Sequence, residues 1–141
     1  MLANRRKQLS KDLELARVLV VHDDLTSRLT LKAVLEAGGY FGDAAASAAE
    51  AVGKLDERQY ELVLSDLQME SSEAGLKVLA HAKLMDYKPA TALLTTYQNQ
   101  RLELRPDVLV EPEDVPGLLG KVADLISQRA ARIVERQLRQ Q

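Results

Sequence analysis

The sequence alternates short apolar runs of strand length with longer segments whose apolar residues recur at helical spacing. Five runs have the length of buried strands: residues 17–22, 40–46, 61–65, 91–95 and 107–110. Apolar strands that alternate with helices are typical of a parallel sheet covered by helices on both faces. Because crossovers between parallel strands are right-handed, few arrangements of five such units remain. We therefore predict an α/β fold, a three-layer, doubly wound, five-stranded parallel sheet of flavodoxin-like type.

Local signals mark where the helices begin and end. Gly38 and Gly39 form a stop signal after the first helix, and Ser47 with Glu50 forms a capping box before the second. The last helix is expected to begin near Glu113 and to run almost to the end of the sequence. The apolar positions on the first three helices are Leu31, Val34 and Leu35, then Ala48, Ala51, Val52 and Leu55, then Leu76, Leu79 and Ala80.

Composition excludes several classes of protein. A chain of 141 residues with a formal charge of −2 fits one globular domain and has no basic excess for nucleic-acid binding. It contains no cysteine, which rules out disulfides, thiol catalysis and cysteine-bound metals. No apolar run follows the basic residues 5–7 before Val18, and no segment has the length and hydropathy of a membrane span. We therefore expect a cytoplasmic protein without membrane contact.

Polar side chains follow several predicted strands at the point where each strand ends. The candidates are His22, Asp23 and Asp24 after the first strand, Asp66 after the third, Thr95 and Thr96 after the fourth, and Glu111 after the fifth. In doubly wound sheets the carboxyl ends of the strands meet at one edge, where ligands bind. Carboxylate and hydroxyl oxygens suit Mg²⁺ or Mn²⁺ together with phosphate oxygens. A carboxylate can also attack phosphorus and form an aspartyl phosphate, and Asp66 is our candidate for that nucleophile.

The order and spacing of these features resemble the receiver domain of two-component response regulators. The matching segments are "VLVVHDD", the apolar strand that ends in Asp66, "AGLKVL", "LLTTY" and the "EP" pair after the fifth strand. The resemblance implies that Asp66 is the phosphoacceptor, and that an acid after the first strand and the carbonyl of Gln68 bind Mg²⁺ (or Mn²⁺) with it. It also implies that the hydroxyl of Thr95, or that of Thr96, binds a phosphoryl oxygen. A histidine kinase or another signalling protein is then the expected partner.

The chain departs from the family pattern at positions that carry the chemistry. A gapless alignment, which we favour, places His22 on the first acid of the family's pair and Asp23 on the second, the direct metal ligand. A shift by one residue would use Asp23 and Asp24 instead. The family's lysine is replaced by Glu111, and its aromatic switch residue in the fifth strand by Val108. The chain between the fourth and fifth strands is short, so we expect a shortened or absent fourth helix.

Some of these residues also have purely structural interpretations. Asp24 is expected to be the N-cap of the first helix rather than a metal ligand, and His22 to bond a backbone carbonyl at the end of its strand. Thr95 and Thr96 are equally compatible with ordinary hydroxyls at a strand end. Asp66 has no local turn or cap role that would explain a carboxylate at the end of a buried strand, and this favours a functional role.

Both ends of the chain extend past the receiver-like domain, which we place at residues 17–128. Residues 1–16 are predicted to form a helical N-terminal extension, and residues 129–141 an arginine-rich extension of the last helix. One stripe of that helix carries Arg129, Arg132, Arg136 and Arg139. The stripe is interpreted as a solvated face, a homodimer contact or a docking surface for a partner. Nucleic-acid binding is poorly supported because the chain carries no known reading motif.

The sequence thus predicts an atypical stand-alone receiver that acts in signal transduction by protein–protein contact and is not an enzyme. We expect Asp66 to be phosphorylated slowly or not at all, because Glu111 cannot supply the donor that a lysine would. The first alternative is a phosphorylation-competent receiver that uses Asp66 and Mg²⁺. A more remote one is a small phosphatase with an aspartyl nucleophile, but haloacid-type phosphatases carry a second aspartate where this chain has Gln68.

Overall fold

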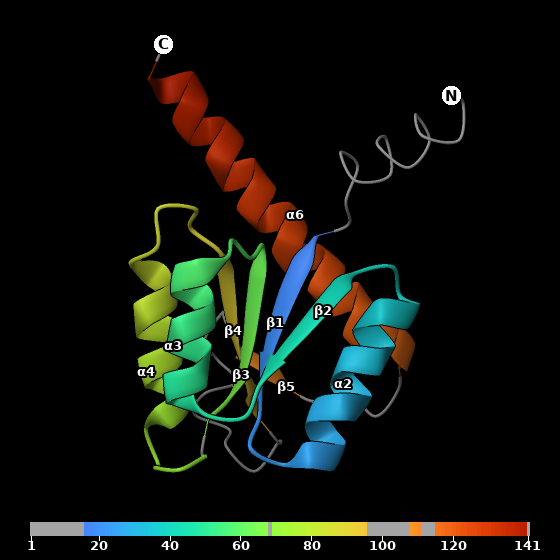
Figure 1. The fold of residues 1–141 in the computed structure, drawn as a ribbon. Helices are drawn as coiled ribbons and strands as arrows, with labels where there is room; N and C mark the ends of the chain where they lie inside the picture. Colours follow the sequence, from blue (N-terminus) through green and yellow to red (C-terminus); the bar gives the residue numbers. More distant parts are fainter. Residues whose placement is uncertain (1–15, 68, 96–107, 111–114, 141) are drawn as a thin grey trace, which may run out of the picture.

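The computed structural model describes residues 16–67, 69–95, 108–110 and 115–140. Within these residues the chain forms five strands and four α-helices (Figure 1). The strands are β1 (Arg17–Val21), β2 (Phe41–Ala45), β3 (Leu62–Asp66), β4 (Ala90–Thr95) and β5 (Val108–Val110). The helices are α2 (Leu25–Ala37), α3 (Ala48–Glu57), α4 (Ala74–Lys83) and α6 (Val115–Arg139).

The strands form one parallel sheet in the order β2-β1-β3-β4-β5. The predicted doubly wound, five-stranded parallel sheet is therefore confirmed, and each predicted strand agrees with the observed one to within one residue at either end. The agreement has a simple cause. The strands at the centre of the sheet are covered on both faces, so their apolar residues run continuously and stand out in the sequence.

Helices cover both faces of the sheet, as Figure 1 shows. Val18 and Val20 of β1 pack into one core with buried residues of α2 and α6. Leu19 and Val21 point to the other face and pack with buried residues of α3 and α4. Because neighbouring residues of one strand serve two separate cores, the architecture has three layers, as predicted.

The glycine stop signal after α2 and the N-cap of α3 are both observed, although the capping box of α3 differs in one bond. Gly39 has a φ of 95°, a left-handed conformation that favours glycine, and it ends the turn after α2. The Ser47 hydroxyl accepts a hydrogen bond from the Glu50 backbone N–H at 3.2 Å, as in a capping box. The Glu50 carboxylate, however, accepts from the N–H of Ala46 rather than from that of Ser47. The box is therefore closed one residue earlier along the chain than the motif predicts.

The buried face of α4 differs from the apolar positions expected from the sequence. Leu79 is buried as expected, but Leu76 is 41% exposed and Ala80 is also exposed. The face toward the sheet is formed instead by Ala74, Val78 and Ala82 at a spacing of four residues, together with Leu79. The small residues at this spacing let the helix lie close to β3 and β4, which turns Leu76 toward solvent.

Helix α6 extends well beyond the sheet (Figure 1). Its 25 residues correspond to about 37 Å, and among them only Leu118 and Val122 are buried. The predicted extension of the last helix is therefore confirmed. The predicted N-terminal helix and the shortened fourth helix fall in residues 1–15 and 96–107, which lie outside the described residues. No helix in the described part of the chain is long and apolar enough to span a membrane.

Candidate functional site

The carboxyl ends of β1 and β3 lie side by side at the point where the strand order reverses. The chain leaves β1 toward α2 on one face of the sheet and leaves β3 toward α4 on the other. These two connections diverge from the edge between the strand ends, which is where doubly wound folds bind ligands. Three polar residues predicted from the sequence are placed there: His22, Asp23 and Asp66.

Asp66 is the last residue of β3, and its side chain is 26% exposed. The four residues before it are fully buried, so the strand passes through the core and delivers a carboxylate to the edge. Its Oδ2 atom lies 3.7 Å from Nε2 of His22. This distance is longer than a direct hydrogen bond and is compatible with two ligands of one cation whose bonds are each about 2 Å long.

Asp23 completes a group of three potential ligands. Its Oδ1 atom lies 3.7 Å from Nδ1 of His22, and its side chain is 50% exposed. One ligand atom from each of His22, Asp23 and Asp66 lies within 4.8 Å of the other two. No second group of three such residues occurs in the described parts of the chain. The edge therefore combines two carboxylates and one imidazole in the space of a single metal site.

Asp24 is the N-cap of α2, as the sequence predicts. Its Oδ2 atom accepts a hydrogen bond from the Ser27 backbone N–H at 2.9 Å. That bond, together with one from the Ser27 hydroxyl, holds the pKa of Asp24 below its usual value. With its carboxylate committed to the helix, Asp24 is not a member of the three-residue group. This arrangement supports the gapless alignment, in which His22 and Asp23 line the site.

His22 was expected to form a hydrogen bond with a backbone carbonyl, and this prediction is wrong. The Nδ1 atom does not bond a backbone carbonyl but accepts a hydrogen bond from the Asp24 N–H at 3.1 Å. The turn into α2 directs this N–H back toward the imidazole, because the first N–H groups of a helix have no partner within it. Since Nδ1 is an acceptor, a neutral ring carries its proton on Nε2, the atom nearest Asp66. The guanidinium of Arg28 also donates to the His22 carbonyl at 2.9 Å and steadies this turn.

Gly75 fixes the backbone that follows Asp66. A Cβ atom on this residue would lie 2.2 Å from the Asp66 carbonyl oxygen and 2.7 Å from Cα of Leu67. Its N–H donates to the Leu67 carbonyl at 3.0 Å. Glycine is therefore required for α4 to begin against the loop that carries Asp66. The sequence signal was a glycine at the start of a helical pattern, which by itself does not reveal what lies against it.

Glu70 has a role that sequence reasoning missed. Its Oε1 atom accepts a hydrogen bond from the Ala48 N–H, at the start of α3, at 2.8 Å. A carboxylate at this position satisfies a donor that the helix leaves unpaired and interacts favourably with the helix dipole. The bond ties the loop after β3 to the neighbouring helix. No local pattern indicates it, because its partners lie 22 residues apart in the chain.

The other predicted site residues are less fully described. Thr95 ends β4, one residue after Leu94, which pairs with Asp66, so its backbone reaches the same edge. Val108 begins β5 and pairs with Leu93. Gln68, Thr96 and Glu111 lie outside the described residues.

The arginine stripe separates into one residue with a structural contact and three exposed residues. The guanidinium of Arg129 donates to the carbonyls of Tyr87 at 2.6 Å and Lys88 at 2.9 Å. It thereby fastens α6 to the segment between α4 and β4, at the opposite end of the sheet from Asp66. Arg132, Arg136 and Arg139 are exposed.

Comparison with known proteins agrees with this geometry. The family model of the response regulator receiver domain matches residues 18–106. A search of curated proteins found no match. Among solved structures, the response regulator protein TrrA from Thermotoga maritima, in complex with Mg²⁺-BeF, is 30% identical with a TM-score of 0.68. The match covers 79% of this chain and 99% of TrrA.

Two further structures show the same fold. The chemotaxis response regulator CheY4 of Vibrio cholerae is 23% identical with a TM-score of 0.67, over 79% of this chain and 98% of CheY4. NtrX from Brucella abortus, in complex with ATP, is 19% identical with a TM-score of 0.78. That match covers 87% of this chain but only 29% of NtrX, so the chain spans less than a third of that protein.

Proposed function

This chain belongs to the response regulator receiver domain family, and from that premise we propose that it is an atypical receiver that signals through contact with another protein. Asp66 then holds the phosphoacceptor position, and its phosphorylation is slow or absent. The observation that carries the proposal is the environment of Asp66. Its carboxylate emerges from a buried strand beside an imidazole, where the family pattern expects a second acid.

The chemistry of phosphoryl transfer explains why we expect Asp66 to be phosphorylated slowly or not at all. With acetyl phosphate as donor, a carboxylate oxygen of Asp66 attacks phosphorus, the phosphorus bond to the acetyl oxygen breaks, and acetate leaves with the electron pair. Donors must hold the phosphoryl oxygens in line during this step. Glu111 stands where the family has a lysine, and an ionised carboxylate can only accept hydrogen bonds. Loss of one such donor lowers a rate by roughly a hundredfold to a thousandfold.

The carboxylates of Asp23 and Asp66 fit a divalent cation, whereas His22 could join them only if its ring gave up the hydrogen bond from the Asp24 N–H to Nδ1, because Nε2 otherwise carries the proton. Two carboxylates and an imidazole lie within 4.8 Å of one another, and the like charges of Asp23 and Asp66 gain from a cation between them. Such a cation would supply positive charge to incoming phosphoryl oxygens. An imidazole is a poorer ligand for Mg²⁺ than a carboxylate is, so His22 is expected to weaken Mg²⁺ binding relative to a site with three acids. Mg²⁺ or Mn²⁺ is therefore proposed as a weak ligand of this site.

A phosphorylation-competent receiver remains the second candidate. It is favoured by the 26% exposure of the Asp66 side chain, which leaves the nucleophile accessible, and by the position of Asp23 beside it. A phosphatase has no comparable support, because the chain offers Gln68 where a general acid would be needed.

Intact-mass measurement separates the two candidates. The protein and its Asp66→Asn variant are incubated with acetyl phosphate and Mg²⁺, and the mass is followed with time. We expect the native chain to gain the mass of a phosphoryl group slowly or not at all, and Asp66→Asn to gain none. Rapid and complete labelling of the native chain, absent from Asp66→Asn, would establish the competent receiver instead.

A further inference from the structure

A basic groove lies at the end of the sheet opposite to Asp66. It runs between α6 and the segment that joins α4 to β4 and encloses about 330 Å³. Among the described residues, four cationic side chains and no acidic one line it: Lys83, Lys88, Arg132 and Arg136. Thr91 of β4 also lines it, three residues before the partner of Asp66 in the sheet. The groove and the phosphoacceptor edge are thus separated by about 10 Å of strand.

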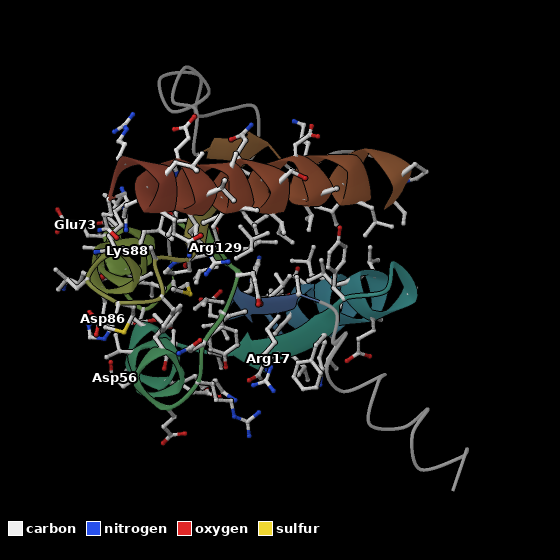
Figure 2. The ribbon with its side chains drawn as sticks, turned by 90° about the horizontal axis from the view of Figure 1, so that it is seen from above. Arg17, Asp56, Glu73, Asp86, Lys88 and Arg129 are labelled. Carbon is white, nitrogen blue, oxygen red and sulfur yellow. The ribbon has the colours of Figure 1, made fainter. Side chains whose placement is uncertain are left out.

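The groove is held in shape by contacts within the chain. Figure 2, viewed from this end of the molecule, shows Arg129 of α6 and Lys88 of the neighbouring segment close together. Arg129 donates to the carbonyls of Tyr87 and Lys88, and the Lys88 ammonium donates to the Lys83 carbonyl at 3.0 Å. The bonds of Arg129 fix α6 relative to the segment that joins α4 to β4, so the groove has its shape without a ligand. A preformed site binds with a smaller loss of conformational entropy.

Lys88 adopts a strained backbone conformation at this groove. Its φ is 44°, and it is the one residue other than glycine with positive φ in the described parts of the chain. Glycine or asparagine would adopt this conformation at lower cost, and the following Pro89 restricts the position further. Strain of this kind concentrates at functional sites. A lysine here supplies a charge to the groove that glycine or asparagine would not.

We propose that this groove binds an acidic segment of a partner protein. The proposal rests on the proposed function, because it assigns the partner contact of the receiver to this edge. Arg132 and Arg136, one helical turn apart, can both bind carboxylates, and Leu125 adds an apolar side chain to the lining. All four cations are exposed, whereas small-molecule sites are enclosed and mostly apolar. An open groove of this kind suits a protein partner, because the surface of the partner would cover the bound segment.

Charge argues against the other occupants. A symmetric dimer through this face would bring the same arginines of α6 together, and like charges repel. The first residues of this chain carry Arg5, Arg6 and Lys7, which are also of the wrong sign. A long polyanion such as a nucleic acid is opposed by the net charge of −2 on the whole chain.

Fluorescence anisotropy with a labelled amphipathic peptide that carries glutamates on one face tests the proposal. The matched control peptide has glutamines at the same positions. Two charge-reversal variants of the full chain are compared: Arg132→Glu with Arg136→Glu in the groove, and Lys77→Glu on α4 with Lys121→Glu on α6, both outside the groove and outside the arginine stripe. The two variants carry the same change in charge.

We expect the glutamate peptide to bind the native chain and the groove variant to weaken binding about tenfold or more, while the control variant changes it about twofold or less. Asp66→Asn should bind like the native chain, so a failure here is distinct from a failure of the phosphoacceptor assignment. Equal weakening by both charge-reversal variants, binding of the glutamine peptide, or no binding at all would overturn the proposal. So would competition by inorganic triphosphate at concentrations as low as those of the peptide, since that would make the groove a small-anion site.

Discussion

The Nε2 atom of His22 lies 3.7 Å from Oδ2 of Asp66, so an imidazole lies beside the residue that we propose as the phosphoacceptor. The backbone N–H of Asp24 holds the other ring nitrogen at 3.1 Å and fixes the ring in this orientation. A second carboxylate here would add negative charge and a hard oxygen ligand. An imidazole supplies neither, so we expect the site to bind Mg²⁺ less tightly than an all-acid site would.

Metal binding should therefore be weak and should improve when the acid is restored. We expect millimolar Mg²⁺ or Mn²⁺ to raise the melting temperature of the native chain modestly, because the cation relieves repulsion between Asp23 and Asp66. His22→Asp should increase the shift produced by Mg²⁺; a tenfold gain in affinity is worth about 1.4 kcal/mol at saturating metal, or about 3–5 °C for a domain of this size. Asp23→Asn should abolish it. If the metal leaves the melting temperature of all three proteins unchanged, these residues do not form a metal site.

Gly75 and Gly53 offer a matched test of the loop that positions Asp66. Both lie in helices, but a Cβ atom on Gly75 would clash with the Asp66 and Leu67 backbone, whereas one on Gly53 would meet nothing within 4 Å. We expect Gly75→Ala to lower the free energy of unfolding by about 1–3 kcal/mol or more. Gly53→Ala should leave it unchanged or raise it by up to about 1 kcal/mol, because alanine favours helix. Urea denaturation of both variants measures the difference. Equal effects would mean that the close approach at Gly75 does not constrain the fold.

Acid should weaken the fold through Asp43. This carboxylate accepts hydrogen bonds from the Tyr60 hydroxyl at 2.7 Å and the Lys54 ammonium at 3.1 Å. Partial burial opposes its ionisation, but these bonds outweigh burial and hold the pKa of Asp43 below the usual 3.8. A group whose pKa is lower in the folded state stabilises the protein above its unfolded pKa, and this contribution disappears as the pH falls through the folded value.

The corresponding variant is Asp43→Asn, compared with the native chain by urea denaturation. At neutral pH we expect its free energy of unfolding to be lower by about 1–2 kcal/mol, because the charge-assisted bonds are lost. The difference should shrink below pH 3.8 as the native carboxyl group takes up its proton. A difference that stays constant across this range would show that ionisation of Asp43 contributes nothing to stability.

The fold was predictable because its signals are local. Runs such as Val18–Val21 and Leu62–Leu64 are buried on both faces and therefore continuously apolar, and Asp66 interrupts one of them at the edge. Asp24 could be assigned as an N-cap because its bond to Ser27 spans only three residues. Features of this kind depend on neighbours in the chain and not on the tertiary arrangement.

The details of the site were less predictable because they depend on distant contacts. The bond from Ala48 to Glu70 and those from Arg129 to the segment before β4 join residues far apart in the sequence. Leu76 is exposed because α4 turns its small residues toward the sheet. The spacing of apolar residues alone did not indicate which of them would face the sheet. For His22 the sequence indicated a strand-end histidine, but the partner of each ring nitrogen depends on how the turn into α2 closes.

We propose that Glu111 makes Asp66 a poor phosphoacceptor, and this can be measured as the rate of labelling by acetyl phosphate in Mg²⁺. Intact mass is followed with time for the native chain, Glu111→Lys, and Glu111→Lys combined with Asp66→Asn as the control for labelling elsewhere. We predict slow or undetectable labelling of the native chain and an increase of about tenfold or more in Glu111→Lys, since the restored donor is worth up to roughly a thousandfold where the rest of a site is complete. The double variant should stay unlabelled. Rapid labelling of the native chain, unchanged by Glu111→Lys, would show that Glu111 does not limit the phosphorylation of Asp66.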